Sequence, residues 1–143
     1  MMTNHPAEVL GRPVPYPKKA PLVYLIDDDK SYRYLYELVF PEAGVDVKTF
    51  ESGEAALSAM PELPPPDYLF VDFRLNRMNG EQFVSELSRQ MPDLHRTSRL
   101  VGWSSLQKGG PLTQSFEAAV DTYVQKPHDL DQLVHVVKRL VGM

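Results

Sequence analysis

Short apolar segments recur along the chain, and each is followed by a longer segment with a different hydrophobic period. Most of the short segments are nearly all apolar, which is typical of strands buried on both faces of a parallel sheet. The second of them alternates apolar and polar residues, which indicates a half-exposed strand nearer an edge. The predicted strands are Leu22–Ile26, Val45–Phe50, Tyr68–Val71, Leu100–Trp103 and Thr122–Val124.

The longer segments carry apolar residues at helical spacing. The strongest pattern, Asp129–Val141, has its apolar residues on one face and Asp129 in the position of an N-cap. The weakest, Pro111–Val120, is preceded by two glycines, and Gly in a helical turn costs roughly 1 kcal/mol relative to Ala. We therefore expect a marginal helix there. The predicted helices are Lys30–Phe40, Ser52–Met60 (with Ser52 as N-cap), Gly80–Gln90, Pro111–Val120 and Asp129–Val141.

Strand and helix alternate along the chain, which predicts an α/β doubly wound fold with a parallel sheet. Helices on both faces of the sheet explain why the central strands are so apolar. Residues 1–20 contain Pro6, Pro13, Pro15 and Pro17 and no hydrophobic period. We expect them to form a flexible Pro-rich arm, followed by one domain over residues 21–143.

Composition narrows the classes of function. A net charge of −4 and a pI near 5.5 weigh against direct binding of nucleic acid, which needs a basic surface. The absence of cysteine from the sequence excludes disulfides, thiolate metal sites and thiol catalysis. The sequence has neither an apolar run of membrane-spanning length nor a signal-peptide core, so a cytoplasmic location is the default expectation.

Polar residues follow the predicted strands at their carboxyl ends. Because these ends share one edge of a parallel sheet, the side chains should converge there. Carboxylates that crowd together raise one another's pKa unless a cation neutralises them, and oxygen ligands without His or Cys favour Mg²⁺. The residues are Asp27 and Asp28 after the first strand, Asp72 after the third, Ser104 after the fourth and Lys126 after the fifth.

A lysine opposite a metal ion leaves room for a doubly charged oxyanion between two positive centres. This arrangement suits phosphoryl transfer, with the carboxylate of Asp72 as the nucleophile. Each residue alone has an ordinary explanation: acids start helices, Ser104 fits a turn and Lys126 a surface charge. Their joint placement at four strand ends favours a functional site.

With these residues in place, the sequence resembles the receiver domain of two-component response regulators. The resemblance covers roughly residues 21–142, and it implies a flavodoxin-like (βα)5 fold with strand order 2-1-3-4-5, as in chemotaxis regulators. It also implies a cytoplasmic signalling protein rather than an enzyme, apart from self-phosphorylation and slow autodephosphorylation. The matching stretches are residues 23–29, Tyr68–Asp72, Ser104 and Tyr123–Pro127.

The resemblance assigns roles around the acceptor. It implies that Asp72 receives a phosphoryl group from a phosphohistidine on a sensor histidine kinase or a histidine phosphotransfer protein. The Mg²⁺ ligands it implies are Asp27, Asp28, Asp72 and the backbone carbonyl of Arg74. It leaves the downstream protein target unknown and leaves open both a homodimer and a place in a longer regulator.

Further roles concern the switch. The resemblance implies that Lys126 pairs with a phosphoryl oxygen and that the bond to Pro127 is cis. It makes Ser104 the hydroxyl switch residue and Tyr123 the aromatic side chain that turns inward with it. Tyr123 is explained equally well as an ordinary aromatic residue of a strand, without a role in switching.

The chain departs from the family pattern in several places. Asn76 stands where proline is common, so the loop after the acceptor is expected to be less rigid. His128 replaces an apolar residue and is expected at the surface. Arg74 and Leu106 occupy positions that influence attack by water, and a bulky cation and an apolar group there suggest slow autodephosphorylation.

Tyr34 and Leu38 lie off the apolar face of the first helix. Exposed apolar side chains scattered singly need no explanation, but beside the site these two slightly favour a docking patch for the phosphodonor.

Competing interpretations remain at this point. A degenerate receiver could act as a phosphorylation-independent binding or dimerisation module, although the complete residue set argues against it. An Mg²⁺-dependent phosphohydrolase would carry a general-acid Asp where Arg74 stands. A nucleotide-binding domain would carry a Gly-rich loop where the chain has acids.

Overall fold

The computed structural model describes residues 8–9, 12–13 and 19–142. Its main sheet has five parallel strands in the order β4-β3-β5-β6-β7. Counted along the domain this is 2-1-3-4-5, so the predicted topology is confirmed. The strands are β3 Leu22–Ile26, β4 Asp46–Phe50, β5 Tyr68–Val71, β6 Arg99–Ser104 and β7 Thr122–Gln125.

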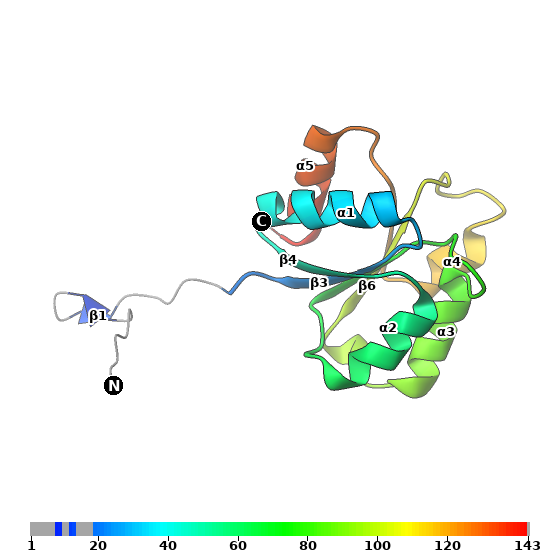
Figure 1. Ribbon diagram of the computed structural model, residues 1–143, viewed down its shortest axis with the longest axis horizontal. Helices are drawn as coiled ribbons and strands as arrows, with labels where there is room; N and C mark the ends of the chain where they lie inside the picture. The colour runs from blue at the N-terminus through cyan, green and yellow to red at the C-terminus, as the bar shows by residue number, and fades with distance from the viewer. Residues whose placement is uncertain (1–7, 10–11, 14–18, 143) are drawn as a thin grey trace.

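Helices cover both faces of this sheet, so the domain has three layers. In Figure 1, α1 and α5 lie on one face, and α2, α3 and α4 lie on the other. The helices are α1 Lys30–Val39, α2 Gly53–Ala59, α3 Gly80–Gln90, α4 Gln114–Ala119 and α5 Leu130–Leu140, with short 3₁₀ segments at Phe40–Ala43, Met60–Glu62 and Leu94–Arg96.

Most helices start at a side-chain cap that the local sequence supplies. Ser52 accepts a hydrogen bond from the amide of Ala55 and begins α2, as predicted. Asp129 accepts from the amide of Gln132 and begins α5, also as predicted. Asp29 caps α1, so the third acid of the Asp27–Asp29 triplet serves the helix rather than the site.

Alternate residues of the central strands face the two helical layers. Tyr24 and Ile26 of β3 belong to the core under α2 and α3, whereas Val23 and Leu25 belong to the core under α1 and α5. The second core contains the fully buried Trp103, whose ring packs against several other aromatic rings. Burial of both strand faces accounts for the apolar runs in the sequence.

The fourth helix is shorter than predicted, and part of the predicted arm is described. The fourth helix was predicted over Pro111–Val120, but α4 covers only Gln114–Ala119 and Thr113 makes no side-chain cap bond. In the range predicted to be an arm, β1 (Glu8–Val9) and β2 (Arg12–Pro13) form a short antiparallel pair. The rest of the predicted arm up to residue 18 lies outside the described residues.

Within the described ranges, no helix has the length and apolar composition needed to cross a membrane.

Candidate functional site

The carboxyl ends of the strands hold the predicted polar residues at one edge of the sheet. Backbone hydrogen bonding continues one residue past three of the strands, so the residues that follow them are fixed by the ladder itself. These bonds run from the amide of Asp27 to the carbonyl of Phe50 (3.1 Å), from Asp72 to Ile26 (3.2 Å) and from Lys126 to Ser104 (2.8 Å). The sheet therefore positions two acids and the lysine.

A single ammonium group joins the two acids. Nζ of Lys126 lies 3.0 Å from Oδ2 of Asp27 and 2.9 Å from Oδ2 of Asp72. The side chains are nearly closed to solvent, with 13% of Lys126, 2% of Asp27 and 11% of Asp72 exposed. This contact links positions 99 and 54 residues apart in the sequence, and it confirms that the strand ends converge.

The remaining carboxylate oxygens accept backbone hydrogen bonds. Oδ1 of Asp27 accepts from the amide of Asp29 at 2.9 Å, and Oδ1 of Asp72 accepts from the amide of Arg74 at 3.1 Å. Each oxygen of both buried carboxylates thus has a partner, as buried polar groups require. These bonds fix the orientation of the Asp72 carboxylate, with Oδ2 directed at Lys126.

Burial and charge pull the pKa values of this cluster in opposite directions. Burial raises the pKa of Asp72, and the neighbouring Lys126 only partly offsets this rise. For Lys126 burial alone would lower the pKa, but Asp72, Tyr36 and Asp27 outweigh it and raise the pKa above its ordinary value. The ammonium group therefore keeps its proton, and Asp72 is a desolvated carboxylate held against it.

Asp28 is half-buried and faces a different space. It lines a polar hollow of about 400 Å³ together with Glu51, Ser52, Asn76 and Arg77. Among the residues that the structure describes, no three carboxylate or imidazole side chains already form a group that could hold a metal ion. The donor set still fits a hard cation in kind, because Asp27, Asp28 and Asp72 offer only oxygens at one sheet edge.

The two predicted switch residues bind the same backbone segment. Oγ of Ser104, which is fully buried, accepts from the amide of Leu106 at 3.2 Å. The hydroxyl of Tyr123 donates to the carbonyl of Leu106 at 2.7 Å, and its ring packs edge-on against Phe116. Tyr123 is thus buried and directed inward in this structure.

The loop after the acceptor is held close to the end of β5. The amide of Gly80 donates to the carbonyl of Phe73 at 2.8 Å. A Cβ atom on Gly80 would lie only 2.5 Å from the carbonyl oxygen of Asp72, so the start of α3 needs glycine there. In the same loop Arg77 has a left-handed φ of 67°.

One expectation around the lysine is wrong and another is confirmed. The described residues contain no cis peptide bond, so the Lys126–Pro127 bond is trans and not cis. The trans isomer is the intrinsically favoured one, and the local sequence alone does not select cis. His128 is exposed, as expected.

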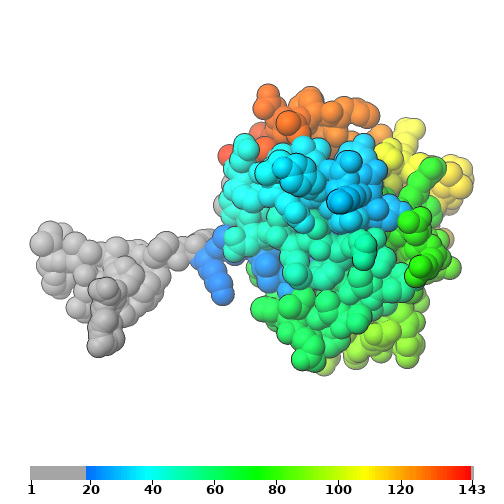
Figure 2. All heavy atoms as spheres, viewed as in Figure 1, coloured from blue at the N-terminus to red at the C-terminus, as the bar shows by residue number. Residues whose placement is uncertain are grey.

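Helix α1 contributes both expected and unexpected side chains. Tyr34 and Leu38, the predicted docking residues, are 66% and 55% exposed on a helix that borders α5 at the surface (Figure 2). The sequence did not reveal that Tyr32 and Tyr36 lie near Lys126, with ring centroids 5.1 Å and 5.9 Å from Nζ. Their spacing of four residues, starting three positions after the acidic triplet, was the available signal.

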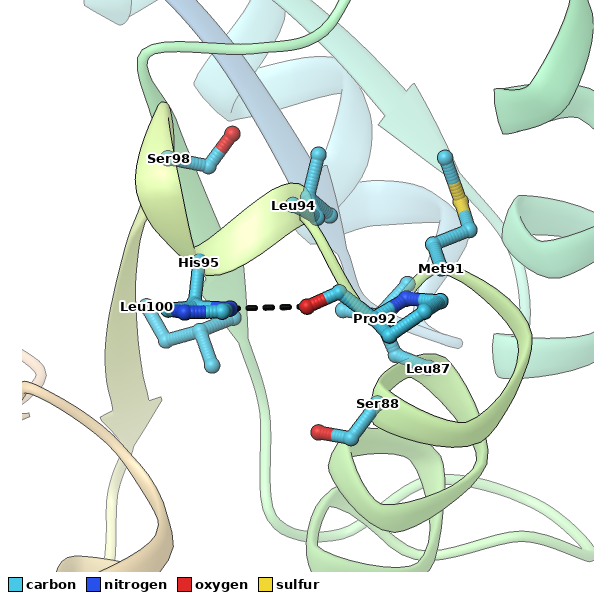
Figure 3. A pocket seen from close by; sticks show the side chains of 8 residues that line it. All are labelled: Leu87, Ser88, Met91, Pro92, Leu94, His95, Ser98 and Leu100. Carbon is cyan, nitrogen blue, oxygen red and sulfur yellow. Dashed lines mark hydrogen bonds between the residues drawn. The ribbon is translucent and has the colours of Figure 1, made fainter.

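A second cavity lies at the start of β6, away from this site. Figure 3 shows it between the end of α3 and the 3₁₀ turn at Leu94–Arg96. Its volume is about 30 Å³, room for a water molecule but not for a larger ligand. The ring of His95 lines this cavity, and its Nδ1 donates a hydrogen bond to the carbonyl of Pro92 at 2.8 Å. This cavity therefore offers no competing site.

Comparison with known proteins gives a consistent result. The pattern that defines the response regulator receiver domain matches residues 23–138. A DNA-binding transcriptional regulator NtrC of Salmonella typhimurium is 28% identical over 121 residues, which are 85% of this chain and 25% of that protein. The sensor histidine kinase GacS of Pseudomonas protegens is 25% identical over 87% of this chain and 14% of that protein. The chain thus spans about a quarter or less of these relatives.

Solved structures share the fold. The chemotaxis response regulator CheY4 of Vibrio cholerae matches with a TM-score of 0.72 at 21% identity, covering 85% of this chain and 99% of that one. The response regulator TrrA of Thermotoga maritima, solved in complex with Mg²⁺ and BeF, matches with a TM-score of 0.66 at 23% identity, covering 84% of this chain and 98% of that one.

Proposed function

The chain belongs to the response regulator receiver domain family, and we propose that it accepts a phosphoryl group on Asp72 from a phosphohistidine donor. The observation that carries the proposal is the ammonium group of Lys126, buried and shared between Asp27 and Asp72. It places a fixed positive charge beside the Asp72 carboxylate, which the backbone amide of Arg74 also orients. Such preorganised charge is what phosphoryl transfer needs.

The proposed reaction forms one bond and breaks one. An oxygen of the Asp72 carboxylate attacks phosphorus, and the bond from phosphorus to the histidine nitrogen breaks. The electron pair of that bond stays on the nitrogen, which then takes a proton. Lys126 shifts from the carboxylate toward a phosphoryl oxygen, so the same ammonium neutralises the product.

We propose that Mg²⁺ binds beside Asp72 as a second cation, in addition to the ammonium group of Lys126. Asp27, Asp28 and Asp72 would hold it with the backbone carbonyl of Arg74, and it would neutralise the phosphoryl oxygens when bound. Support comes from the oxygen-only donor set and from the half-buried Asp28, which faces an open hollow.

The test is covalent labelling of the whole chain by a small phosphodonor. We expect the mass of one phosphoryl group to be gained in Mg²⁺ and not in excess chelator, with the label mapped by fragmentation to the peptide that contains Asp72. A chain that stays unlabelled would instead be a phosphorylation-independent binding module.

We propose that the switch passes from the acceptor to the surface through Leu106. Its amide and carbonyl are bonded by Ser104 and Tyr123 respectively. If the hydroxyl of Ser104 turns to a phosphoryl oxygen, it releases the amide of Leu106. The segment at Leu106 can then move, and the hydrogen bond from Tyr123 to its carbonyl can break. The output is proposed to be contact with another protein in the cytoplasm, in line with the acidic charge of the chain.

Slow autodephosphorylation is expected because Leu106 is apolar and cannot hold a water molecule. Replacing Leu106 by glutamine should speed loss of the label about fivefold, since one hydrogen bond to the attacking water is worth about 1 kcal/mol. The half-life is measured by intact mass after the donor is removed, with Gln107→Leu as the neighbouring control. An unsubstituted chain that loses its label as quickly as fast chemotaxis regulators would contradict this.

Tyr34 and Leu38 are proposed to contact the phosphohistidine donor. We expect Tyr34→Ala to slow transfer from a cognate phosphotransfer protein severalfold, because interfacial tyrosines are often the residues that dominate binding energy. Labelling by a small phosphodonor, which needs no docking, should be unaffected. Equal transfer rates from the protein donor to Tyr34→Ala and to the unsubstituted chain would exclude a docking role for Tyr34.

A further inference from the structure

Two tyrosine rings lie close to the ammonium group of Lys126. Nζ lies 5.1 Å from the ring centroid of Tyr32 and 5.9 Å from that of Tyr36. Both distances fall within the range of cation–π attraction, which extends to about 6 Å. The ammonium group therefore lies within reach of both carboxylates and of both tyrosine rings.

The rings are held in place by the core. Tyr36 is 2% exposed and packs edge-on against the fully buried Trp103, with centroids 6.2 Å apart. Tyr32, which is 49% exposed, is stacked on Tyr36 at 6.0 Å and an interplanar angle of 19°. The buried ring of Tyr36 thus fixes the outer ring of Tyr32. Together the two rings form a wall, the tyrosine wall, that extends from the core to the solvent.

A hollow beside this wall leaves space for the lysine to move. Its volume is about 160 Å³, and it is lined by Tyr32, Tyr36, Trp103, Lys126 and neighbouring residues from the loop between β7 and α5. A lysine side chain has several rotatable bonds and loses rotamer entropy when it is fixed. Without a wall, the ammonium could swing from the acids into this hollow and toward water.

We propose that Tyr32 and Tyr36 are positioning residues that hold the Lys126 ammonium group at the acceptor carboxylate. This inference rests on the proposed function. The ring face of Tyr32 attracts the cation but accepts only weak hydrogen bonds, so the N–H groups of Lys126 remain available to carboxylate and phosphoryl oxygens. The rings thereby keep the charge where it is needed during transfer without competing for it.

The test compares two substitutions of the outer ring. Tyr32→Leu keeps an apolar side chain but removes the ring, whereas Tyr32→Phe keeps the ring and removes only the hydroxyl. We expect Tyr32→Leu to lower the rate of labelling by a small phosphodonor at saturating Mg²⁺ by roughly three- to tenfold, and Tyr32→Phe to change it less than twofold. Tyr68→Leu, a half-buried tyrosine at the opposite end of the sheet, is the control and should label normally.

A second readout reports the position of the lysine itself. The ε-methylene protons of Lys126, observed by NMR in lysine-labelled protein, should be shifted upfield by the ring currents in the unsubstituted chain and in Tyr32→Phe. The shift should shrink in Tyr32→Leu and persist in Tyr68→Leu. A general loss of folding would alter the whole spectrum rather than this signal.

The outcomes separate the two claims. No labelling of the unsubstituted chain would overturn the proposed function, whatever the lysine signal shows. Normal labelling of Tyr32→Leu would overturn the positioning role while leaving the function intact. An unchanged Lys126 signal in Tyr32→Leu would overturn the role as well, since the ring would then not lie over the ammonium.

Discussion

Replacing Asp72 by asparagine is expected to abolish labelling of the chain by a small phosphodonor. The amide has nearly the same shape as the carboxylate but lacks the nucleophilic oxygen, so the label should fall below detection by intact mass. The amide of Arg74 can still donate to the side-chain oxygen, and Lys126 keeps its bond to Asp27. The fold should therefore persist.

Stability should separate loss of the acceptor from loss of the fold. Because the folded-state pKa of Asp72 is raised, the folded chain binds this proton more tightly than the unfolded chain. Ionised Asp72 thus lowers stability at neutral pH, and its favourable contribution exists only at acidic pH where the group is protonated. Asp72→Asn should be at least as stable as the unsubstituted chain by urea denaturation at neutral pH.

A matched substitution at the surface controls for charge. Asp131→Asn removes one negative charge from the exposed face of α5 and should label normally. Full labelling of Asp72→Asn would contradict the assignment. In that case the label would have to be mapped again, with Asp27, the other carboxylate on the same ammonium, as the first position to inspect.

Features fixed by residue type and by strand topology could be predicted, and those fixed by individual side-chain contacts could not. The start of α5 was predicted because the cap Asp129 and its partner amide at Gln132 lie three residues apart. The start of α4 was placed too early. There the loop is held by Glu117, which accepts hydrogen bonds from the amide of Gly109 and the hydroxyl of Thr113, both at 2.7 Å. Hydrophobic periodicity carries no information on such a bond.

The site shows the same division. Convergence of Asp27, Asp72 and Lys126 was predictable because parallel strands end at one edge and their ladder fixes the next residue. The position of the Tyr32 and Tyr36 rings beside Lys126 was not predictable. A helical period assigns both residues to the buried face, although Tyr32 is half exposed. The orientation of these rings toward Lys126 depends on how α1 packs on the sheet, which the period does not specify.

Replacing Lys126 by methionine is expected to destabilise the fold by roughly 3–5 kcal/mol, because two buried carboxylates lose their shared counter-charge. Methionine fills a similar volume, so the loss comes mainly from charge. The free energy of unfolding is measured in urea without Mg²⁺, and Lys138→Met on the exposed face of α5 is the control, with little expected change. Unaltered stability of Lys126→Met would mean that the acids are hydrated or protonated rather than paired.

Two additions to this experiment identify the cause of the loss. The double variant Lys126→Met/Asp72→Asn removes the repulsion between the carboxylates and should recover much of the lost stability, a coupling that independent sites would not show. Mg²⁺ should also stabilise Lys126→Met, by about 1.4 kcal/mol at ten times its dissociation constant. The unsubstituted chain should need more Mg²⁺ for the same gain, because its ammonium group already neutralises one oxygen of each carboxylate. An equal Mg²⁺ response in the two proteins would show that the lysine and the metal ion do not share these carboxylates, and it would remove the proposed Mg²⁺ site from Asp27 and Asp72.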